Sequence, residues 1–305
     1  MNFKVLIDDF FDNFNTDLDL TPTNNKKILS LINDFEDGEW RYKNFQNFVW
    51  DNITETALSY RERESLINQP LSQLTEAAKK LRLTDKEADI SKGSELAEIV
   101  LYGIMKLHFK ALPVVPKIYY KQNPKDNAKG ADSVHIVVEN DDFTLWFGEA
   151  KFYSSISNAR LGSIIDSVEN SLKTDKIKKE NSIITDLQDI DSLVKNNVLN
   201  KKIKDALSSK ESLDSLKPKL HVPILLLHEC ELTKNGSELS EEYKKTIINK
   251  HKNRSEAYFK KQIEKFGERL YKYSEITFHI ILFPVPIKKN IIDEFVEIAT
   301  FHQNR

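Results

Sequence analysis

The sequence predicts an α/β fold in which a mixed β-sheet is flanked by helices. Two short apolar runs, 133–138 and 143–147, are separated by Glu139-Asn140-Asp141-Asp142, whose Asn and Asp residues favour a turn, so the runs predict an antiparallel hairpin. Two longer runs, 220–228 and 276–284, are too continuously apolar for surface strands and predict buried ones. Helical patterns lie between these runs, and this alternation is typical of the α/β class.

Residues 1–90 are predicted to form a helical N-terminal region packed on the core. Apolar patches with helical character, separated by polar turns, cover residues 5–14, 23–35, 40–50 and 54–80. Neither an internal repeat nor a Pro/Gly-rich linker separates this region from the rest. We therefore expect it to cover one side of the sheet, with a separate DNA-binding domain as the less favoured interpretation.

Residues 91–305 are predicted to form the α/β core. The stretch 94–105 is apolar nearly all round and predicts a buried helix, which the hairpin follows. The remaining elements are expected in the following order: a helix at 157–172, a lysine-rich helical insertion at about 173–219, the strand 220–228, helices at 240–250 and 255–273, the strand 276–284 and a closing helix at 287–302.

Composition narrows the class of protein. The chain has 305 residues, is 40% hydrophobic and carries a net charge of −2, so it has enough apolar side chains for a packed core and is not a polycation that coats DNA. Its single cysteine, Cys230, excludes an internal disulfide and favours a reducing compartment. We expect a cytoplasmic protein without a membrane segment, because no apolar run approaches the roughly twenty residues that cross a bilayer. The oligomeric state stays open.

The residues that carry chemistry surround the hairpin. Alternate side chains of a strand share a face, so Glu149 and Lys151 point the same way, and Asp132 at the head of the neighbouring strand reaches the same open end. Two carboxylates offer the oxygen ligands that Mg²⁺, or Mn²⁺ in its place, prefers. A lysine two residues further on can orient or help deprotonate the attacking water, and can offset charge on a phosphate. The pattern predicts a metal-dependent nuclease.

A third acid, Glu98, lies in the middle of the apolar helix 94–105. A buried carboxylate is costly unless it is paired or binds a metal, so Glu98 becomes a candidate metal ligand. The alternative is a buried acid satisfied by a nearby lysine or backbone group. For the other residues the plain alternatives are a turn-capping Asp132 and an exposed ion pair between Glu149 and Lys151.

Positive and hydroxyl side chains near this site are candidates for contact with nucleic-acid phosphates. The candidates are Lys117, Lys121, Lys125 and Lys129, which lead into Asp132, and Arg160 and Ser163 on the polar face of the helix 157–172. The alternatives are ordinary solvated lysines and a plain amphipathic helix.

The segments 93–102, 129–135 and 146–153 resemble HamA, the nuclease subunit of the Hachiman anti-phage system, within the PD-(D/E)xK nuclease superfamily. The resemblance implies a restriction-endonuclease-like αβββαβ core, Mg²⁺-dependent DNA cleavage and a partner helicase, HamB, that restrains the nuclease. Asp132, Glu149 and Lys151 match the catalytic residues, and Glu98 matches the helix acid. Ala131 stands where the superfamily often has proline, but this position contributes no chemistry.

Two functions therefore compete. The first is a Mg²⁺-dependent deoxyribonuclease, an endonuclease or nickase, that acts in anti-phage defence under the control of a helicase. The alternative is a catalytically inactive nuclease-fold module that binds a helicase or DNA, which the near-neutral charge and the large N-terminal region favour. No Walker-type glycine loop is present in the sequence, so ATP use is expected of the partner.

Overall fold

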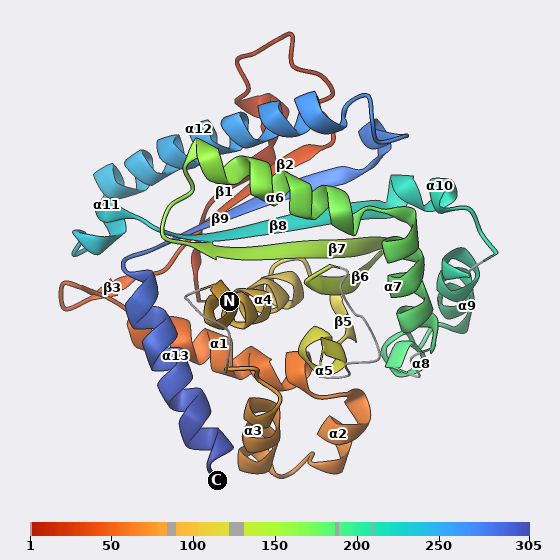
Figure 1. The fold of residues 1–305 in the computed structure, drawn as a ribbon, viewed down its shortest axis with the longest axis horizontal. Helices are drawn as coiled ribbons and strands as arrows, with labels where there is room; N and C mark the ends of the chain where they lie inside the picture. Colours follow the sequence, from red (N-terminus) through yellow and green to blue (C-terminus); the bar gives the residue numbers. More distant parts are fainter. Residues whose placement is uncertain (1, 84–89, 122–130, 187–188, 209) are drawn as a thin grey trace.

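A computed structural model of the chain describes residues 2–83, 90–121, 131–186, 189–208 and 210–305. Its centre is a seven-stranded sheet with the order β1-β2-β9-β8-β7-β6-β5 (Figure 1). Strands β2, β9, β8 and β7 run parallel, whereas β1, β6 and β5 pair antiparallel at the two sides. The strands are β1 (Lys4–Phe10), β2 (Lys26–Ile32), β5 (Leu112–Val115), β6 (Ser133–Glu139), β7 (Asp142–Tyr153), β8 (Leu220–Glu229) and β9 (Thr277–Val285). The predicted mixed sheet flanked by helices is confirmed.

Helices cover both faces of this sheet and bury two separate apolar cores (Figure 1). One face packs against α1 (Tyr42–Ala57), α3 (Pro70–Lys79), α4 (Ile90–Leu107) and α13 (Lys288–Gln303). The other packs against α6 (Asn158–Ser171), α7 (Thr174–Asp186), α9 (Asn197–Leu207) and α12 (Glu241–Phe266). The smaller elements are the strands β3 (Phe35–Glu36) and β4 (Glu39–Trp40) and the helices α2 (Tyr60–Ser65), α5 (Lys117–Lys121), α8 (Asp189–Leu193), α10 (Leu213–Leu216) and α11 (Glu231–Lys234).

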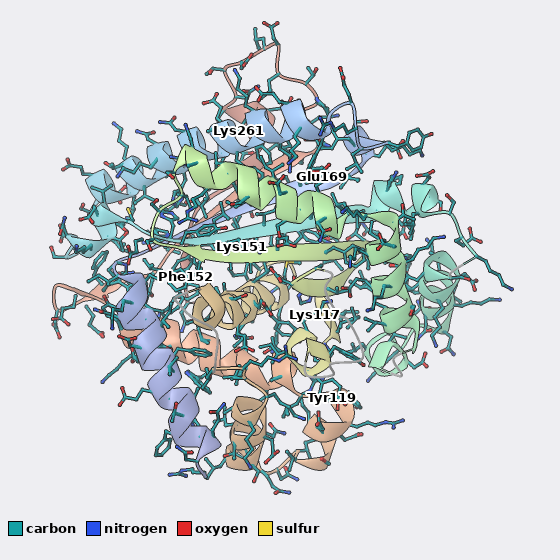
Figure 2. The ribbon with its side chains drawn as sticks, viewed as in Figure 1. Lys117, Tyr119, Lys151, Phe152, Glu169 and Lys261 are labelled. Atoms are coloured by element: carbon teal, nitrogen blue, oxygen red, sulfur yellow. The ribbon has the colours of Figure 1, made fainter. Side chains whose placement is uncertain are left out.

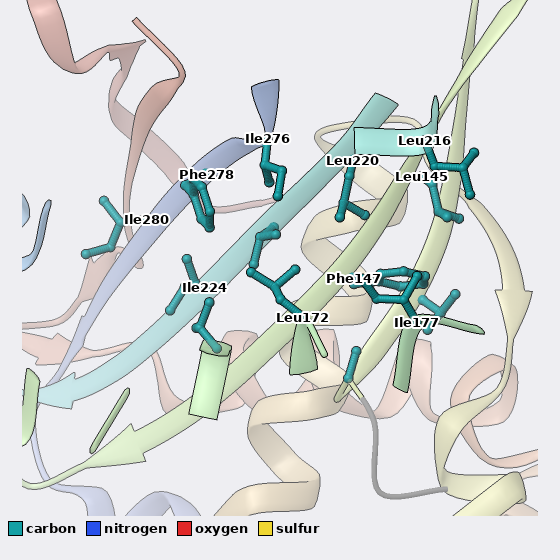
Figure 3. Close-up of a cluster of buried hydrophobic side chains, with 14 of the residues drawn as sticks. Leu145, Phe147, Leu172, Ile177, Leu216, Leu220, Ile224, Ile276, Phe278 and Ile280 are labelled. Carbon is teal, nitrogen blue, oxygen red and sulfur yellow. The ribbon is translucent and has the colours of Figure 1, made fainter. Parts of the chain in front are cut away.

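The core beneath α6 and α7 is built from alternate residues of the central strands. Figure 3 shows Phe147 of β7 and Ile224 of β8 packed with Leu172 and Ile177 from the helices above them. These side chains are almost fully removed from water, and each contributes about 1.5–3 kcal/mol relative to an exposed position. This packing holds β7 rigidly against its neighbours and so fixes the strand that carries the candidate site.

The prediction for the first thirty-five residues is wrong. The stretches 5–14 and 23–35 were expected to be helical, but β1 and β2 form there and join the main sheet, with β2 paired to β9. A short, fully buried strand has apolar residues on both faces, so periodicity alone does not separate it from a helix. Residues 1–90 therefore supply two strands of the core sheet as well as the confirmed helices α1 to α3.

Strand β2 also buries a lysine. Lys26 has no exposed surface, and its ammonium donates to Pro22 O at 2.6 Å and Asn25 Oδ1 at 2.8 Å while lying 4.6 Å from the centre of the Tyr273 ring. Burial lowers the pKa of Lys26 to about 7, although the charge of Asp12 opposes this.

The hairpin predicted from the turn residues is confirmed and is longer than expected. Strands β6 and β7 pair from Ser133↔Gly148 to Glu139↔Asp142, and the turn residues Asn140 and Asp141 have φ values of 49° and 58°. Asn and Asp tolerate this left-handed conformation, which is the backbone of a tight hairpin turn.

Most of the later predictions agree with the structure. The helix at 157–172 and the helical insertion at 173–219 are confirmed, as are both buried strands and the closing helix. The helices expected at 240–250 and 255–273 are one continuous helix, α12. Among the described residues no helix has both the length and the apolar character needed to cross a membrane.

Candidate active site

The candidate site lies on the face of β7 that α6 covers. Glu149 and Lys151 point toward this face, whereas Gly148 faces α4: a Cβ built on Gly148 would lie 2.8 Å from Leu101 Cδ2 and would also collide with Ser133. A glycine is needed here because the helix approaches the strand so closely.

Asp132 immediately precedes β6 and is held opposite Glu149 by the hairpin register. Its backbone N–H donates to Gly148 O at 2.7 Å, and its carboxylate accepts from Ala150 N at 3.1 Å. Both bonds tie Asp132 to β7, so its position depends on the strand pairing rather than on a flexible loop.

The two carboxylates share one cation. Lys151 Nζ lies 2.9 Å from Glu149 Oε2 and 3.4 Å from Asp132 Oδ2. The structure thus brings together the three residues that the register predicted to converge. Their catalytic role stays a prediction.

Ser167 is a member of this site that the sequence reasoning missed. It lies on α6, and its hydroxyl donates to Glu149 Oε2 at 2.8 Å. Ser163, which was chosen instead, is exposed and donates to its own helix at Arg160 O. The available signal was helical spacing: Ser167 follows Ser163 by one turn on the same polar face.

The pKa values of both Glu149 and Lys151 are raised, but for different reasons. Glu149 is 3% exposed, and its burial, followed by the nearby charge of Asp132, raises its pKa to about 7, against the opposing effects of Lys151 and Ser167. Burial alone would lower the pKa of Lys151, but the charges of Asp132 and Glu149 outweigh it and raise that pKa above its ordinary value. In the metal-free site Lys151 is therefore an ammonium and not a base.

This donor set fits a Mg²⁺-sized ion. Mg²⁺ commonly takes one or two protein carboxylates and completes its shell with water and substrate phosphate. Asp132 and Glu149 already hold the ammonium of Lys151 between them. Of the two carboxylate oxygens of Glu149, Lys151 and Ser167 both contact Oε2. Within the described part of the chain no hydrogen bond reaches the other oxygen, Oε1, which leaves it for an ion.

Glu98 does not join this pair. It is 4% exposed and accepts from Ser94 Oγ at 3.1 Å, and its helix α4 packs against the opposite face of β7. Among the described residues no group of three or more His, Cys, Asp or Glu could hold a metal ion. Glu98 as a third ligand stays a prediction that this arrangement does not support.

Lys117, predicted to contact phosphate, is instead part of the core. Labelled on α5 in Figure 2, it is 4% exposed and forms an ion pair of 2.5 Å with Glu180 of α7, which is also buried. A buried lysine with its own carboxylate offers no charge to a ligand, so this interpretation is corrected. The side chain of Lys121, and residues Lys125 and Lys129, lie outside the described residues.

Arg160 is exposed on α6 and lies 5.5 Å from the centre of the Tyr153 ring. Together with Ser163 it remains accessible, and phosphate contact by either residue stays a prediction. His135 packs against Tyr102 of α4 at 5.0 Å between ring centres, so it faces the opposite side of the sheet from Asp132.

Comparison with known protein families identifies the family to which the chain belongs. The HamA family model matches residues 8–299, nearly the whole length. The chain belongs to the HamA family. This HamA-family protein is accordingly a component of Hachiman anti-phage defence. A comparison with curated proteins gives no match.

The extent of the HamA match also bears on how the chain is organised. It includes the end of β1, from Asp8 to Phe10, and all of β2, as well as the hairpin with Asp132, Glu149 and Lys151. The N-terminal strands thus belong to the HamA family unit.

Proposed function

We propose that this HamA-family protein is a metal-dependent DNA nuclease of Hachiman defence, controlled by a partner helicase of the HamB kind. The observation that carries the proposal is the ammonium of Lys151 held between Asp132 and Glu149. The element order α4-β5-β6-β7-α6-β8, with a short helix after β5 and a helical insertion before β8, supports it because the PD-(D/E)xK core has an αβββαβ order.

Each residue of the site has a separate role in this proposal. Asp132 and Glu149 would hold Mg²⁺, or Mn²⁺ in its place, and a bound ion supplies polarisation of the scissile phosphate and a more acidic water. Ser167 donates to Glu149 Oε2 and so fixes the orientation of that carboxylate. Lys151, released from the carboxylates, would direct its ammonium toward the phosphate and offset the negative charge that grows on it during attack.

The site is buried, and an ammonium occupies it, and this supports control of nuclease activity by a partner. Glu149 lies beneath α6, and the ammonium of Lys151 occupies the space between the carboxylates. Nuclease activity requires this ammonium to move, and a helicase that governs α6 or the hairpin would control that step. The same closed pair favours the second candidate function, an inactive nuclease-fold module that binds the helicase or DNA.

Cleavage of plasmid DNA tests the proposal. The wild-type protein, with and without the partner helicase, is incubated with supercoiled plasmid and Mg²⁺ or Mn²⁺, beside Glu149→Gln and Lys151→Met. We expect both variants to lose nicking by about a hundredfold or more, since each removes charge that stabilises the transition state. Glu139→Gln is the matched control, because Glu139 is an exposed acid at the other end of the same hairpin.

Equal nicking by the wild type and both site variants would refute the assignment of the active site. Absence of cleavage by every protein, with the helicase and either ion present, would favour the inactive module.

A further inference from the structure

A second cavity lies at the carboxyl end of β8, outside the carboxylate site. It has a volume of about 550 Å³ and is lined by residues from the end of β8, the start of α6, α11 and the first half of α12. Figure 1 shows the place of these elements in the fold. Ligands of α/β proteins commonly bind at the carboxyl ends of parallel strands, and this volume suits a small molecule.

The floor of this cavity contains a chain of hydrogen bonds whose direction can be worked out. His228 Nδ1 lies 3.0 Å from the backbone oxygen of Glu229, which can only accept, so Nδ1 carries a proton. His228 Nε2 lies 3.3 Å from His251 Nε2, and His251 Nδ1 lies 2.6 Å from Ser30 Oγ. With both imidazoles neutral, His251 donates to His228 and Ser30 donates to His251.

Both histidines are neutral in this arrangement. Burial, against the bond to Glu229 and with smaller contributions from the charges of Arg254 and Lys250, lowers the pKa of His228 to about 4. Burial also holds the pKa of His251 well below its ordinary value. The tautomers derived from the hydrogen bonds are therefore the stable ones at neutral pH.

This bonding excludes two kinds of site. Every imidazole nitrogen either donates a proton or accepts one, so neither histidine has a lone pair left for a metal ion. Ser30 is fully buried beneath His251, so its hydroxyl is not an exposed nucleophile. The floor consists of the two imidazole rings, which meet at an interplanar angle of 74°, and the apolar side chain of Ile247.

The rim of the cavity is cationic and polar. Lys250 and Arg254 of α12 line it, and Arg254 Nη1 is oriented by Asn158 Oδ1 at 2.7 Å. Neither cation forms an ion pair with a carboxylate of the described residues. The two acids that also line the cavity have other partners: Glu229 accepts from Lys288 N at 2.7 Å, and Glu231 lies 3.8 Å from Lys234 Nζ. Lys250 and Arg254 are thus two rim cations that form no ion pair with a described acid.

We propose that this cavity binds a nucleotide, with its phosphate on Lys250 and Arg254 and its base packed against the imidazole rings and Ile247. An anionic group matches the cationic rim, and an aromatic ring matches a floor whose polar hydrogens are already used. The ligand is a free mononucleotide or the phosphorylated end of a DNA strand, which share this chemistry. The site does not depend on the nuclease proposal.

Calorimetric titration of the full chain in EDTA tests this, because removal of divalent ions keeps phosphate from the carboxylate site. The probes are dAMP, deoxyadenosine, inorganic phosphate and a 5′-phosphorylated oligonucleotide. We expect dAMP, the oligonucleotide or both to bind, and deoxyadenosine to bind about tenfold or more weakly, because it lacks the charge-assisted bonds. The double variant Lys250→Gln/Arg254→Gln is expected to weaken binding by a similar factor.

Lys252→Gln is the matched control, since Lys252 lies on the same helix but over the Phe14 ring, 5.2 Å from its centre. In the wild-type protein, the imidazole NMR signals of His228 and His251 should shift on saturation, a readout that requires no variant. Binding of dAMP assigns the free nucleotide, and binding of the oligonucleotide alone assigns a strand end. Absence of binding by every phosphorylated probe, unchanged histidine signals, or equal weakening by Lys252→Gln would overturn the proposal.

Discussion

Replacing Glu149 by glutamine should make the metal-free protein more stable at alkaline pH and leave it little changed at acidic pH. Glutamine keeps the size of the side chain and an oxygen that can accept from Ser167, but it removes the buried negative charge. The perturbation therefore isolates the titration of one carboxyl group.

The size of the effect follows from the pKa of Glu149. Burial, together with the charge of Asp132, raises this pKa from 4.5 in the unfolded chain to about 7 in the fold. Between these values the folded protein binds more protons, so the free energy of unfolding falls as pH rises. At about 1.4 kcal/mol per pKa unit, the loss is on the order of 3 kcal/mol and is complete above about pH 7.

Urea unfolding in EDTA at several pH values between 5 and 8 measures this loss. The difference in unfolding free energy between Glu149→Gln and the wild type should grow in favour of the variant by roughly 3 kcal/mol across this range. Glu139→Gln, an exposed acid of the same hairpin, should show no such growth. Parallel pH profiles for Glu149→Gln and the wild type would refute the reasoning.

Three further substitutions test other parts of the structure. Lys117→Met should lower the free energy of unfolding measured in urea by about 3–5 kcal/mol, because Glu180 is left charged and buried. A loss of about 1 kcal/mol or less would contradict a buried ion pair. Lys26→Met should remove a pH dependence of the free energy of unfolding. Because the pKa of Lys26 is lowered in the fold, the free energy of unfolding of the wild type should rise by up to about 1.4 kcal/mol per pH unit from about pH 7 toward 10.5. Identical slopes of unfolding free energy against pH for the variant and the wild type would disprove this. Gly148→Ala should lower the free energy of unfolding by about 1–3 kcal/mol, because the added Cβ overpacks the site. Gly162→Ala should not destabilise the fold, because a Cβ there meets open space. Similar melting temperatures for the two variants would argue against close packing at Gly148.

The hairpin shows how much a local pattern can specify. The turn at Asn140 and Asp141 fixes the pairing of β6 with β7, and pairing alternates side chains between two faces. The meeting of Asp132 with Glu149 and Lys151 could therefore be predicted from the sequence alone.

Other features depended on contacts between segments distant in the chain. The sequence pattern of β2 predicts a helix, because only its place between β1 and β9 explains why both its faces are apolar. Glu98 lies under the opposite face of the sheet because α4 packs there, and helical spacing does not choose a face of a sheet. Ser167, rather than Ser163, reaches Glu149 because of the position at which α6 crosses β7.

Local sequence patterns are enough to predict the α/β class, the hairpin and the face shared by Glu149 and Lys151, because turn chemistry and strand alternation act over a few residues. Tertiary structure alone decided that β1 and β2 enter the sheet, that Lys117 pairs with Glu180, and that His228 and His251 meet above Ser30. These outcomes depend on which apolar surfaces bury one another, and that choice is made by the whole chain at once.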